Sequence, residues 1–144
     1  MKGTINSNTV IQIAFVVKDI EETKKKYAEF LGVDVPDHMV TQKSTDNIVK
    51  GKPNADVSAK LAFFQVGPGL AIELIEPNGV SSVWQDVLDE NGEGFHHIAF
   101  GVSDMEEGIA ACENAGMPCI QKGKGYAYLD GAKDLKCLIE LLPK

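Results

Sequence analysis

The chain alternates between apolar runs and polar stretches with helical spacing. Residues 10–17 (VIQIAFVV) are apolar except for one glutamine, which is typical of a strand covered on both faces. The polar stretch after it has Asp19 placed as an N-cap, Glu22 as its capping-box partner and Gly32 as a stop, which predicts a helix. The side chains expected on its buried face are Ile20, Tyr27, Phe30 and Leu31. Those expected to face water are Glu21, Glu22, Lys24, Lys25 and Lys26.

The same pattern occurs twice in the chain. An offset of 85 residues places 12–22 (QIAFVVKDIEE) over 97–107 (HIAFGVSDMEE), and seven of these eleven positions are identical. The second copy again predicts a strand, a capped helix and a glycine stop, at Gly116. A shorter match at an offset of 67 superposes Ile72-Glu73-Leu74 on Ile139-Glu140-Leu141. The chain is therefore predicted to be an internal duplication, and each half opens and closes with a strand.

Further strands are expected between the opening and closing strands of each half. The candidate strands are 33–43 and 58–67 in the first half and 118–123 and 125–130 in the second. Residues 43–56 are expected to form a surface loop, and 77–94 a linker with a short helix. The predicted fold class is α+β, with two tandem βαβββ modules in a curved mixed sheet. We expect one domain over residues 1–144, with module one at about 9–77, a linker at 78–94 and module two at about 95–143.

Strand alternation brings four polar side chains to one face of this sheet. The larger side chains of the opening strand should pack under the helix, which leaves Gln12 and its small neighbours on the concave side. The repeat places His97 in the equivalent position. The same parity puts Glu73 and Glu140 on the concave side of the two closing strands, where small neighbours leave room for a ligand.

A divalent metal ion accounts for this set of residues better than chance does. A carboxylate in an apolar strand is costly unless its charge is compensated, although either glutamate alone could face solvent from an edge strand. One imidazole, two carboxylates and one amide oxygen suit Zn, Ni, Co, Mn or Fe and leave positions open for water or substrate. The sequence thus predicts a metal-containing cavity with Gln12, Glu73, His97 and Glu140 as ligands.

The adjacent histidines His96 and His97 are expected to differ in role. Successive side chains of a strand emerge on opposite faces, so only one of the two can join Gln12. The repeat selects His97. His96 is then expected to cap or orient the site, or to be exposed.

Composition excludes several classes of function. The net charge is −7 and all fourteen basic residues are lysines, which argues against a nucleic-acid partner because such proteins usually present arginine forks. No apolar run approaches the roughly 18 residues that span a bilayer, so we expect no membrane partner and a cytoplasmic location. Cys112, within a helical pattern, and Cys137, within a predicted strand, are expected to be buried thiols, and with Cys119 they show no metal-ligand spacing.

The segments IQIAFVVKDIEE, IELIEP, GEGFHHIAFGVSDMEE and LIELLP together resemble the vicinal-oxygen-chelate superfamily. Its members include glyoxalase I, methylmalonyl-CoA epimerase, extradiol dioxygenases and bleomycin-resistance binding proteins. The resemblance implies one divalent ion, Zn, Ni, Co or Mn, at Gln12, Glu73, His97 and Glu140. The amino-acid sequences of GEGFHHIAF and ELIEP resemble those of the epimerases. The residue types at the four metal positions, Gln, Glu, His and Glu in chain order, are instead those of animal zinc-type glyoxalase I. A ring-cleaving dioxygenase fits poorly, because its triad needs two histidines.

The resemblance to methylmalonyl-CoA epimerase and that to glyoxalase I both imply proton transfer at a carbon alpha to a carbonyl or thioester, with Glu140 and Glu73 as catalytic residues. An epimerase needs a second base, and no glutamate lies between Glu29 and Glu73, so that base is Glu73 or an aspartate of residues 34–56, if one exists. The alternative is a non-catalytic small-molecule binder of the bleomycin-resistance type.

The expected partners are a small-molecule substrate and a second copy of the chain in a homodimer, with the cavity formed within one chain or across the dimer. The expected pocket walls are Phe63, Gln65, Trp84, Tyr126 and Tyr128, although core packing is the competing explanation for the aromatic residues. An acyl-CoA's phosphates could be met by Lys43, Lys50, Lys52 and Lys60, and a merely solubilising role of these lysines is the alternative.

Overall fold

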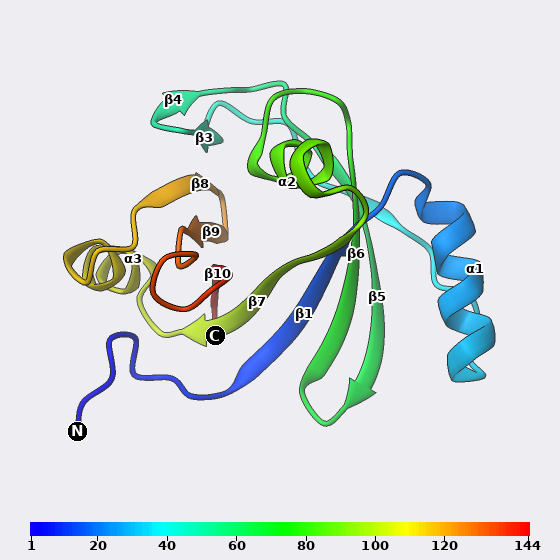
Figure 1. The fold of residues 1–144 in the computed structure, drawn as a ribbon, viewed down its shortest axis with the longest axis horizontal. Coiled ribbons are helices and arrows are strands. Elements are labelled where there is room, and N and C mark those ends of the chain that lie inside the picture. Colours follow the sequence, from blue (N-terminus) through cyan, green and yellow to red (C-terminus); the bar gives the residue numbers. More distant parts are fainter.

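The computed structural model of the protein describes residues 1–144, which form ten strands and three helices (Figure 1). The strands of the first half are β1 (Val10–Val16), β2 (Met39–Val40), β3 (Ile48–Val49), β4 (Lys52–Pro53), β5 (Ala59–Gly67) and β6 (Leu70–Pro77). Those of the second half are β7 (Gly94–Val102), β8 (Cys119–Gly123), β9 (Tyr126–Leu129) and β10 (Leu138–Pro143). The helices are α1 (Ile20–Leu31), α2 (Val83–Asn91) and α3 (Met105–Asn114).

All ten strands belong to one mixed sheet, in the order β2-β5-β6-β1-β7-β10-β9-β8-β3-β4. Figure 1 shows this sheet curving around a central space without closing into a barrel. β1 pairs in parallel with β6, and β7 in parallel with β10, while β1 and β7 join the halves as an antiparallel pair. The fold is therefore α+β with a curved mixed sheet, as the sequence predicts.

The pairing of β1 with β7 reproduces the internal repeat as an approximate two-fold symmetry. Ile13 pairs with Ile98, its own equivalent at an offset of 85 residues. On either side of this pair, Gln12 lies opposite Ala99 and Ala14 opposite His97. Gln12 and His97 therefore occupy symmetric positions next to the centre of the sheet.

The helices divide between the two faces of the sheet. α1 packs on β5 and β6, and α3 packs on β8, β9 and β10, both on the convex side (Figure 1). α2 contacts β1, β6 and β7, and its Trp84 packs with Ala14 and Val16 in the core of the concave side. Phe15 packs instead with the core under α1, so the strand parity predicted for residues 12–17 is confirmed.

α1 begins and ends where the sequence predicts. The Asp19 side chain accepts a hydrogen bond from the Glu22 backbone N–H, and Gly32 ends the helix in the left-handed conformation with φ of 70°. Two predicted orientations are wrong. Phe30 is 85% exposed, although its neighbour Leu31 packs against the core under α1. Lys24 is 4% exposed, and its ammonium group pairs with Glu21 instead of facing water.

The predicted surface loop at 43–56 contains structure that crosses to the other half of the molecule. β3 and β4 form a short hairpin, and β3 pairs with β8 at the far end of the sheet. Asn47 and Val49 are buried, so the expectation of a solvated loop is wrong there. The candidate strand at 33–43 is reduced to Met39–Val40, which pairs with β5 at the other edge.

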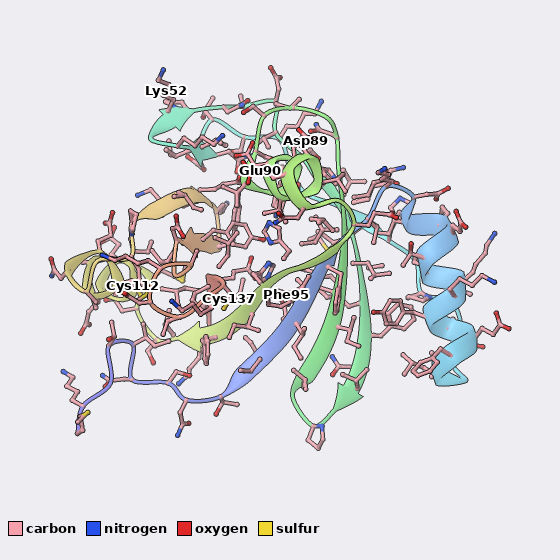
Figure 2. The ribbon with its side chains drawn as sticks, viewed as in Figure 1. Lys52, Asp89, Glu90, Phe95, Cys112 and Cys137 are labelled. Carbon is pink, nitrogen blue, oxygen red and sulfur yellow. The ribbon has the colours of Figure 1, made fainter.

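The cysteines are free thiols. Figure 2 shows Cys112 on α3, where it is buried as expected. Cys137 lies one residue before β10 begins, so its predicted placement within a strand is wrong by that residue. No helix of the chain is both long and apolar enough to cross a membrane.

Candidate metal centre and cavity

Four neighbouring strands each place one of the predicted ligands on the concave face. Glu73 lies on β6, Gln12 on β1, His97 on β7 and Glu140 on β10, and these strands follow one another in the centre of the sheet. Parallel pairing puts Glu73 opposite Ala14 and Glu140 opposite Ala99, so each carboxylate has an alanine beside it. The two halves supply equivalent positions, because the pairing follows the repeat. We refer to these four residues as the candidate metal centre.

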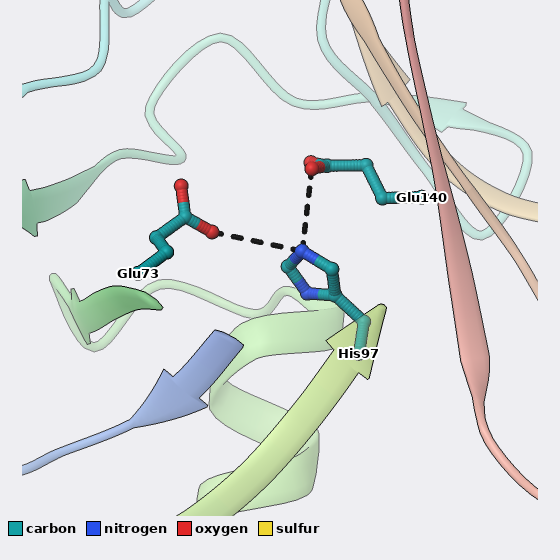
Figure 3. A group of neighbouring side chains, drawn as sticks. All are labelled: Glu73, His97 and Glu140. Carbon is teal, nitrogen blue, oxygen red and sulfur yellow. Dashed lines mark ion pairs between the residues drawn. The ribbon is translucent and has the colours of Figure 1, made fainter. Parts of the chain in front are cut away.

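The carboxylates of the candidate metal centre approach the same ring nitrogen of His97 (Figure 3). His97 Nε2 lies 3.2 Å from Glu140 Oε1 and 3.6 Å from Glu73 Oε1. The three donor atoms lie within 4.8 Å of one another, close enough for one metal ion to contact all three. His97 is fully buried, and each glutamate is 4% exposed.

The donor atoms of the centre have no hydrogen-bond partners within the protein. The buried side-chain atoms without a hydrogen bond are Gln12 Oε1, Glu73 Oε1, His97 Nε2 and Glu140 Oε1, one from each predicted ligand. A buried polar atom without a partner costs about 1–3 kcal/mol, so four at one place indicate a missing common partner. One nitrogen and three oxygen donors fit a divalent cation such as Zn or Mn.

The electrostatics of the site also favour a cation. Burial, and next the negative charge of Glu140, raise the pKa of Glu73 well above its usual range. Burial, followed by the charges of Glu140 and Glu73, likewise raises the pKa of Tyr128 well above its usual range. A bound divalent ion would offset this concentration of negative charge.

His96 does not take the position expected from simple strand alternation. It is 3% exposed, and its Nδ1 lies 2.7 Å from Nδ1 of His97. The reason is a bulge in β7: Ala14 pairs with His97 and Phe15 with Phe95, so His96 has no partner residue in β1. Burial, and then the neighbouring His97, lower the pKa of His96 to about 3. The expectation that the two histidines point to opposite faces is therefore wrong.

A cavity of about 330 Å³ opens from the centre and is lined by Gln12, Glu73 and Glu140. Of the predicted wall residues, Phe63, Trp84, Tyr126 and Tyr128 line it. Gln65 does not, since it lies exposed near the end of β5. The structure thus gathers four of the five predicted wall residues around the candidate metal centre.

The aromatic wall of the cavity is held together by direct contacts. The ring of Trp84 stacks on Tyr126 at a centroid distance of 5.9 Å, and its Nε1 donates a hydrogen bond of 2.9 Å to the Tyr128 hydroxyl. The Tyr128 ring also contacts His97 edge-on at 4.9 Å. α2 and β9 therefore form one continuous wall beside His97.

Sequence reasoning missed much of the cavity's outer lining. The additional residues are Met39, Thr41, Gln42, Ser44, Asn47, Leu61, Lys124, Gly125 and Leu142. Alternation along β10 does place Leu142 on the same face as Glu140, and alternation along β5 could have identified Leu61 from Phe63 in the same way. Residues 39–47 carry no such signal, because only the tertiary fold lays this segment across the cavity. Lys124, in the turn between β8 and β9, is the one cation in the lining.

The chain matches the family model of the glyoxalase/bleomycin resistance protein/dioxygenase superfamily over residues 11–133. The protein YqjC of Bacillus subtilis is 26% identical over 141 residues, which cover 93% of this chain and 91% of that protein.

Solved structures show the same fold at low identity. A hypothetical protein from Bacillus halodurans superposes with a TM-score of 0.65 at 23% identity, covering 94% of each chain. Methylmalonyl-CoA epimerase from Mycobacterium tuberculosis has a TM-score of 0.64 at 19% identity, covering 100% of this chain and 92% of that one. The Streptomyces coelicolor epimerase, in complex with 2-nitronate-propionyl-CoA, has a TM-score of 0.68 at 22% identity, covering 96% and 98%.

Proposed function

The chain belongs to the glyoxalase/bleomycin resistance protein/dioxygenase superfamily, and we propose that it is a metal-dependent enzyme that transfers protons at a carbon alpha to a carbonyl or thioester. The observation that carries this proposal is the set of four buried donor atoms without hydrogen-bond partners, three of which lie within 4.8 Å of one another. One Zn, Ni, Co or Mn ion is the proposed cofactor, held by Gln12, Glu73, His97 and Glu140. When bound, the ion would act as a Lewis acid on a substrate oxygen and make the adjacent C–H more acidic.

The proposed acid and base are Glu73 and Glu140. They are the only carboxylates that line the cavity, and no aspartate of residues 34–56 reaches it. They also come from the two halves of the fold, on either side of His97 (Figure 3). A proton removed from the substrate carbon by one carboxylate can return to a neighbouring carbon, or the other carboxylate can protonate the opposite face of the same carbon.

These two outcomes correspond to two substrate classes. Return to a neighbouring carbon is the glyoxalase I-type reaction of an aldehyde–thiol adduct, and protonation from the opposite face is epimerisation of a branched acyl thioester. Several structural neighbours are methylmalonyl-CoA epimerases, one in complex with methylmalonyl-CoA. Of the lysines considered for acyl-CoA phosphates, Lys50 pairs with Asp86 and Lys60 with Glu76, which leaves Lys43 and Lys52 for that role.

Metal loading combined with solvent deuterium exchange tests the proposal. Metal-free protein is reloaded separately with Zn, Ni, Co or Mn and incubated in D₂O with 2-methyl-branched acyl-CoAs or methylglyoxal–thiol adducts. We expect one ion per centre and deuterium incorporation into one substrate class. Glu140→Gln should lower exchange by about 10²–10⁴-fold, the usual range for an acid–base group, while the protein stays folded. Glu106→Gln, an exposed carboxylate of α3, is the matched control and should exchange normally.

Three results would contradict this proposal. If the reloaded protein binds less than one ion per centre, the proposed metal cofactor is wrong. If Glu140→Gln retains full exchange activity, the assignment of Glu140 as a catalytic base is wrong. If metal binds and small molecules saturate the cavity but no substrate exchanges deuterium, the protein is a non-catalytic binder. The aromatic lining by Phe63, Trp84 and Tyr126 would suit that alternative equally well.

The proposed assembly is a homodimer. Exposed apolar side chains gather along the segment from the end of α1 to β2 and support an apolar contact between copies. These residues are Phe30, Val33, Val35, Met39 and Val40.

A further inference from the structure

His97 of the candidate metal centre contacts a second imidazole, that of His96, through the ring nitrogen that does not face the carboxylates. His96 and His97 contact each other through their Nδ1 atoms, which are 2.7 Å apart, and the ring centroids are 5.0 Å apart. The other nitrogen of His96, Nε2, lies 3.2 Å from the backbone carbonyl oxygen of Val83, the first residue of α2. Each imidazole therefore has one nitrogen committed to the other, and His96 is anchored at both of its nitrogens.

The direction of the hydrogen bonds follows from the chemistry of these atoms. Two ring nitrogens at 2.7 Å require that one carries a proton and the other a lone pair. The carbonyl oxygen of Val83 can only accept, so His96 Nε2 must be the donor there. A neutral imidazole carries one proton, and His96 Nδ1 is then the acceptor. The proton between the rings consequently belongs to His97 Nδ1.

Only a positively charged His96 would reverse the direction of the hydrogen bond between the two rings. Both of its nitrogens would then donate, and an imidazolium would sit at a site that is 3% exposed. Its two hydrogen-bond partners are an imidazole and a carbonyl, neither of which carries a compensating negative charge. Burying an uncompensated charge is strongly unfavourable, so the neutral arrangement prevails.

We propose that His96 is a positioning residue that holds a proton on Nδ1 of His97, so that Nε2, which faces Glu73 and Glu140, is the nitrogen whose lone pair can bind a metal ion. The relay runs from His97 through His96 to the Val83 carbonyl and needs no bound ion. What it implies for metal affinity rests on the proposed function, since that lone pair is what a metal ion would accept. The partner on the second nitrogen of a metal-binding imidazole typically sets its tautomer and ring orientation.

The internal duplication supports this role. β1 has a bulge at the equivalent place: Val10 pairs with Phe100 and Gln12 with Ala99, so Ile11 has no partner residue in β7. Ile11 therefore corresponds to His96, just as Gln12 corresponds to His97. An amide ligand has no tautomer to fix, and an isoleucine precedes it. A histidine occupies the bulge only in the half where the predicted ligand is an imidazole.

Two-bond ¹H–¹⁵N correlation spectra of the metal-free protein test the relay directly. Only three histidines contribute signals, and His38→Gln identifies those of His38. We expect a protonated Nδ1 on His97, and on His96 a protonated Nε2 with an unprotonated Nδ1. An unprotonated Nδ1 on His97 would overturn the proposal. This measurement needs neither metal nor substrate, so its outcome is independent of the proposed function.

Variants then test what the relay does for metal binding. His96→Phe keeps an aromatic ring but no acceptor, and should release His97 into mixed tautomers and weaken Zn binding by about 10–100-fold. His96→Asn keeps an acceptor oxygen near the position of Nδ1 and should recover most of that affinity. Ile11→Ala, at the equivalent bulge, is the packing control and should bind Zn as the unmodified chain does.

The two variants separate the relay from a purely structural role. Equal Zn affinity in His96→Phe and His96→Asn would mean that the bulge residue contributes only shape, and would overturn the proposal. If the unmodified chain shows the expected tautomers but binds no Zn, the relay stands and the proposed metal-dependent function fails.

Discussion

Trp84 and Tyr128 show how single residues hold the wall of the cavity in place. Both are nearly inaccessible to solvent, and they satisfy each other's polar atoms through one hydrogen bond from the indole Nε1 to the phenol oxygen. Their sequence signal is only that of two aromatic residues, which fits core packing as well as a ligand wall. In the structure both residues belong to the concave core and also line the cavity.

Tyr128→Phe should destabilise the protein although it preserves the ring. The substitution leaves the Trp84 N–H buried without an acceptor, which costs about 1–3 kcal/mol of unfolding free energy. Urea unfolding followed by tryptophan fluorescence measures the loss, since Trp84 is the single tryptophan. Tyr27→Phe is the control on the other face, where the ring packs against Phe15 and Phe64, and should change stability by less than about 0.5 kcal/mol. Equal stability of Tyr128→Phe and the unmodified chain would show that the hydrogen bond contributes nothing.

At the scale of elements, the duplication includes the N-terminal caps of α1 and α3, the two helices on the convex side of the sheet. Asp19 caps α1 by accepting from the Glu22 N–H at 3.2 Å, and Asp104 caps α3 by accepting from the Glu107 N–H at 3.0 Å. The ends differ, because Gly32 caps α1 directly, whereas Ala115 follows α3 and Gly116 comes one residue later with φ of 91°. The sequence predicts both starts, since a cap is a local interaction of residues three apart.

Asp19→Ala and Asp104→Ala should have similar effects, each lowering the unfolding free energy by about 0.5–2 kcal/mol. Each substitution removes one side-chain acceptor from an otherwise similar helix start. Chemical denaturation of the two variants gives the comparison. Asp19→Asn and Asp104→Asn retain an acceptor oxygen and should unfold close to the unmodified chain. If only one of the two alanine variants loses stability, the two caps are equivalent in geometry but differ in their contribution to the unfolding free energy.

At the scale of the whole molecule, the curvature of one sheet brings together side chains that are distant in sequence. Glu73 and Glu140 belong to different halves, yet both lie within 3.6 Å of His97 Nε2. The β3–β4 hairpin of the first half pairs with β8 of the second. Across that junction, the Tyr126 hydroxyl donates a hydrogen bond to Asn47 Oδ1. The cavity is thus a property of the complete sheet and not of either half.

This arrangement predicts how metal-free stability depends on pH. Burial and the charge of Glu140 raise the pKa of Glu73 in the folded state above that of the unfolded chain, about 4.3. Between these two values the folded state holds the extra proton, so the unfolding free energy should fall as pH rises through this window. Urea titrations of metal-free protein at several pH values measure the slope, and Glu73→Gln should reduce it.

Metal binding should reverse that trend. Because the ion binds the ionised carboxylate, the stability gained by adding Zn should grow as pH rises through the same window. Glu106→Gln serves again as the exposed control and should retain the full slope. Metal-free protein that becomes more stable as pH rises through this window would contradict the arrangement of charges at the centre.

The sequence by itself determined what depends on local spacing and on the repeat. Apart from the β3–β4 hairpin, it was sufficient for the strand–helix order. It was also sufficient for the caps at Asp19 and Asp104 and for the shared face of Gln12, Glu73, His97 and Glu140, because side-chain alternation and duplication act over short distances. The tertiary structure decided the rest. A bulge in β7 turned His96 toward His97, and the curved sheet carried residues 39–47 across the cavity. Pairing across the whole sheet sets both of these features, and no local pattern encodes a partner strand from the other half.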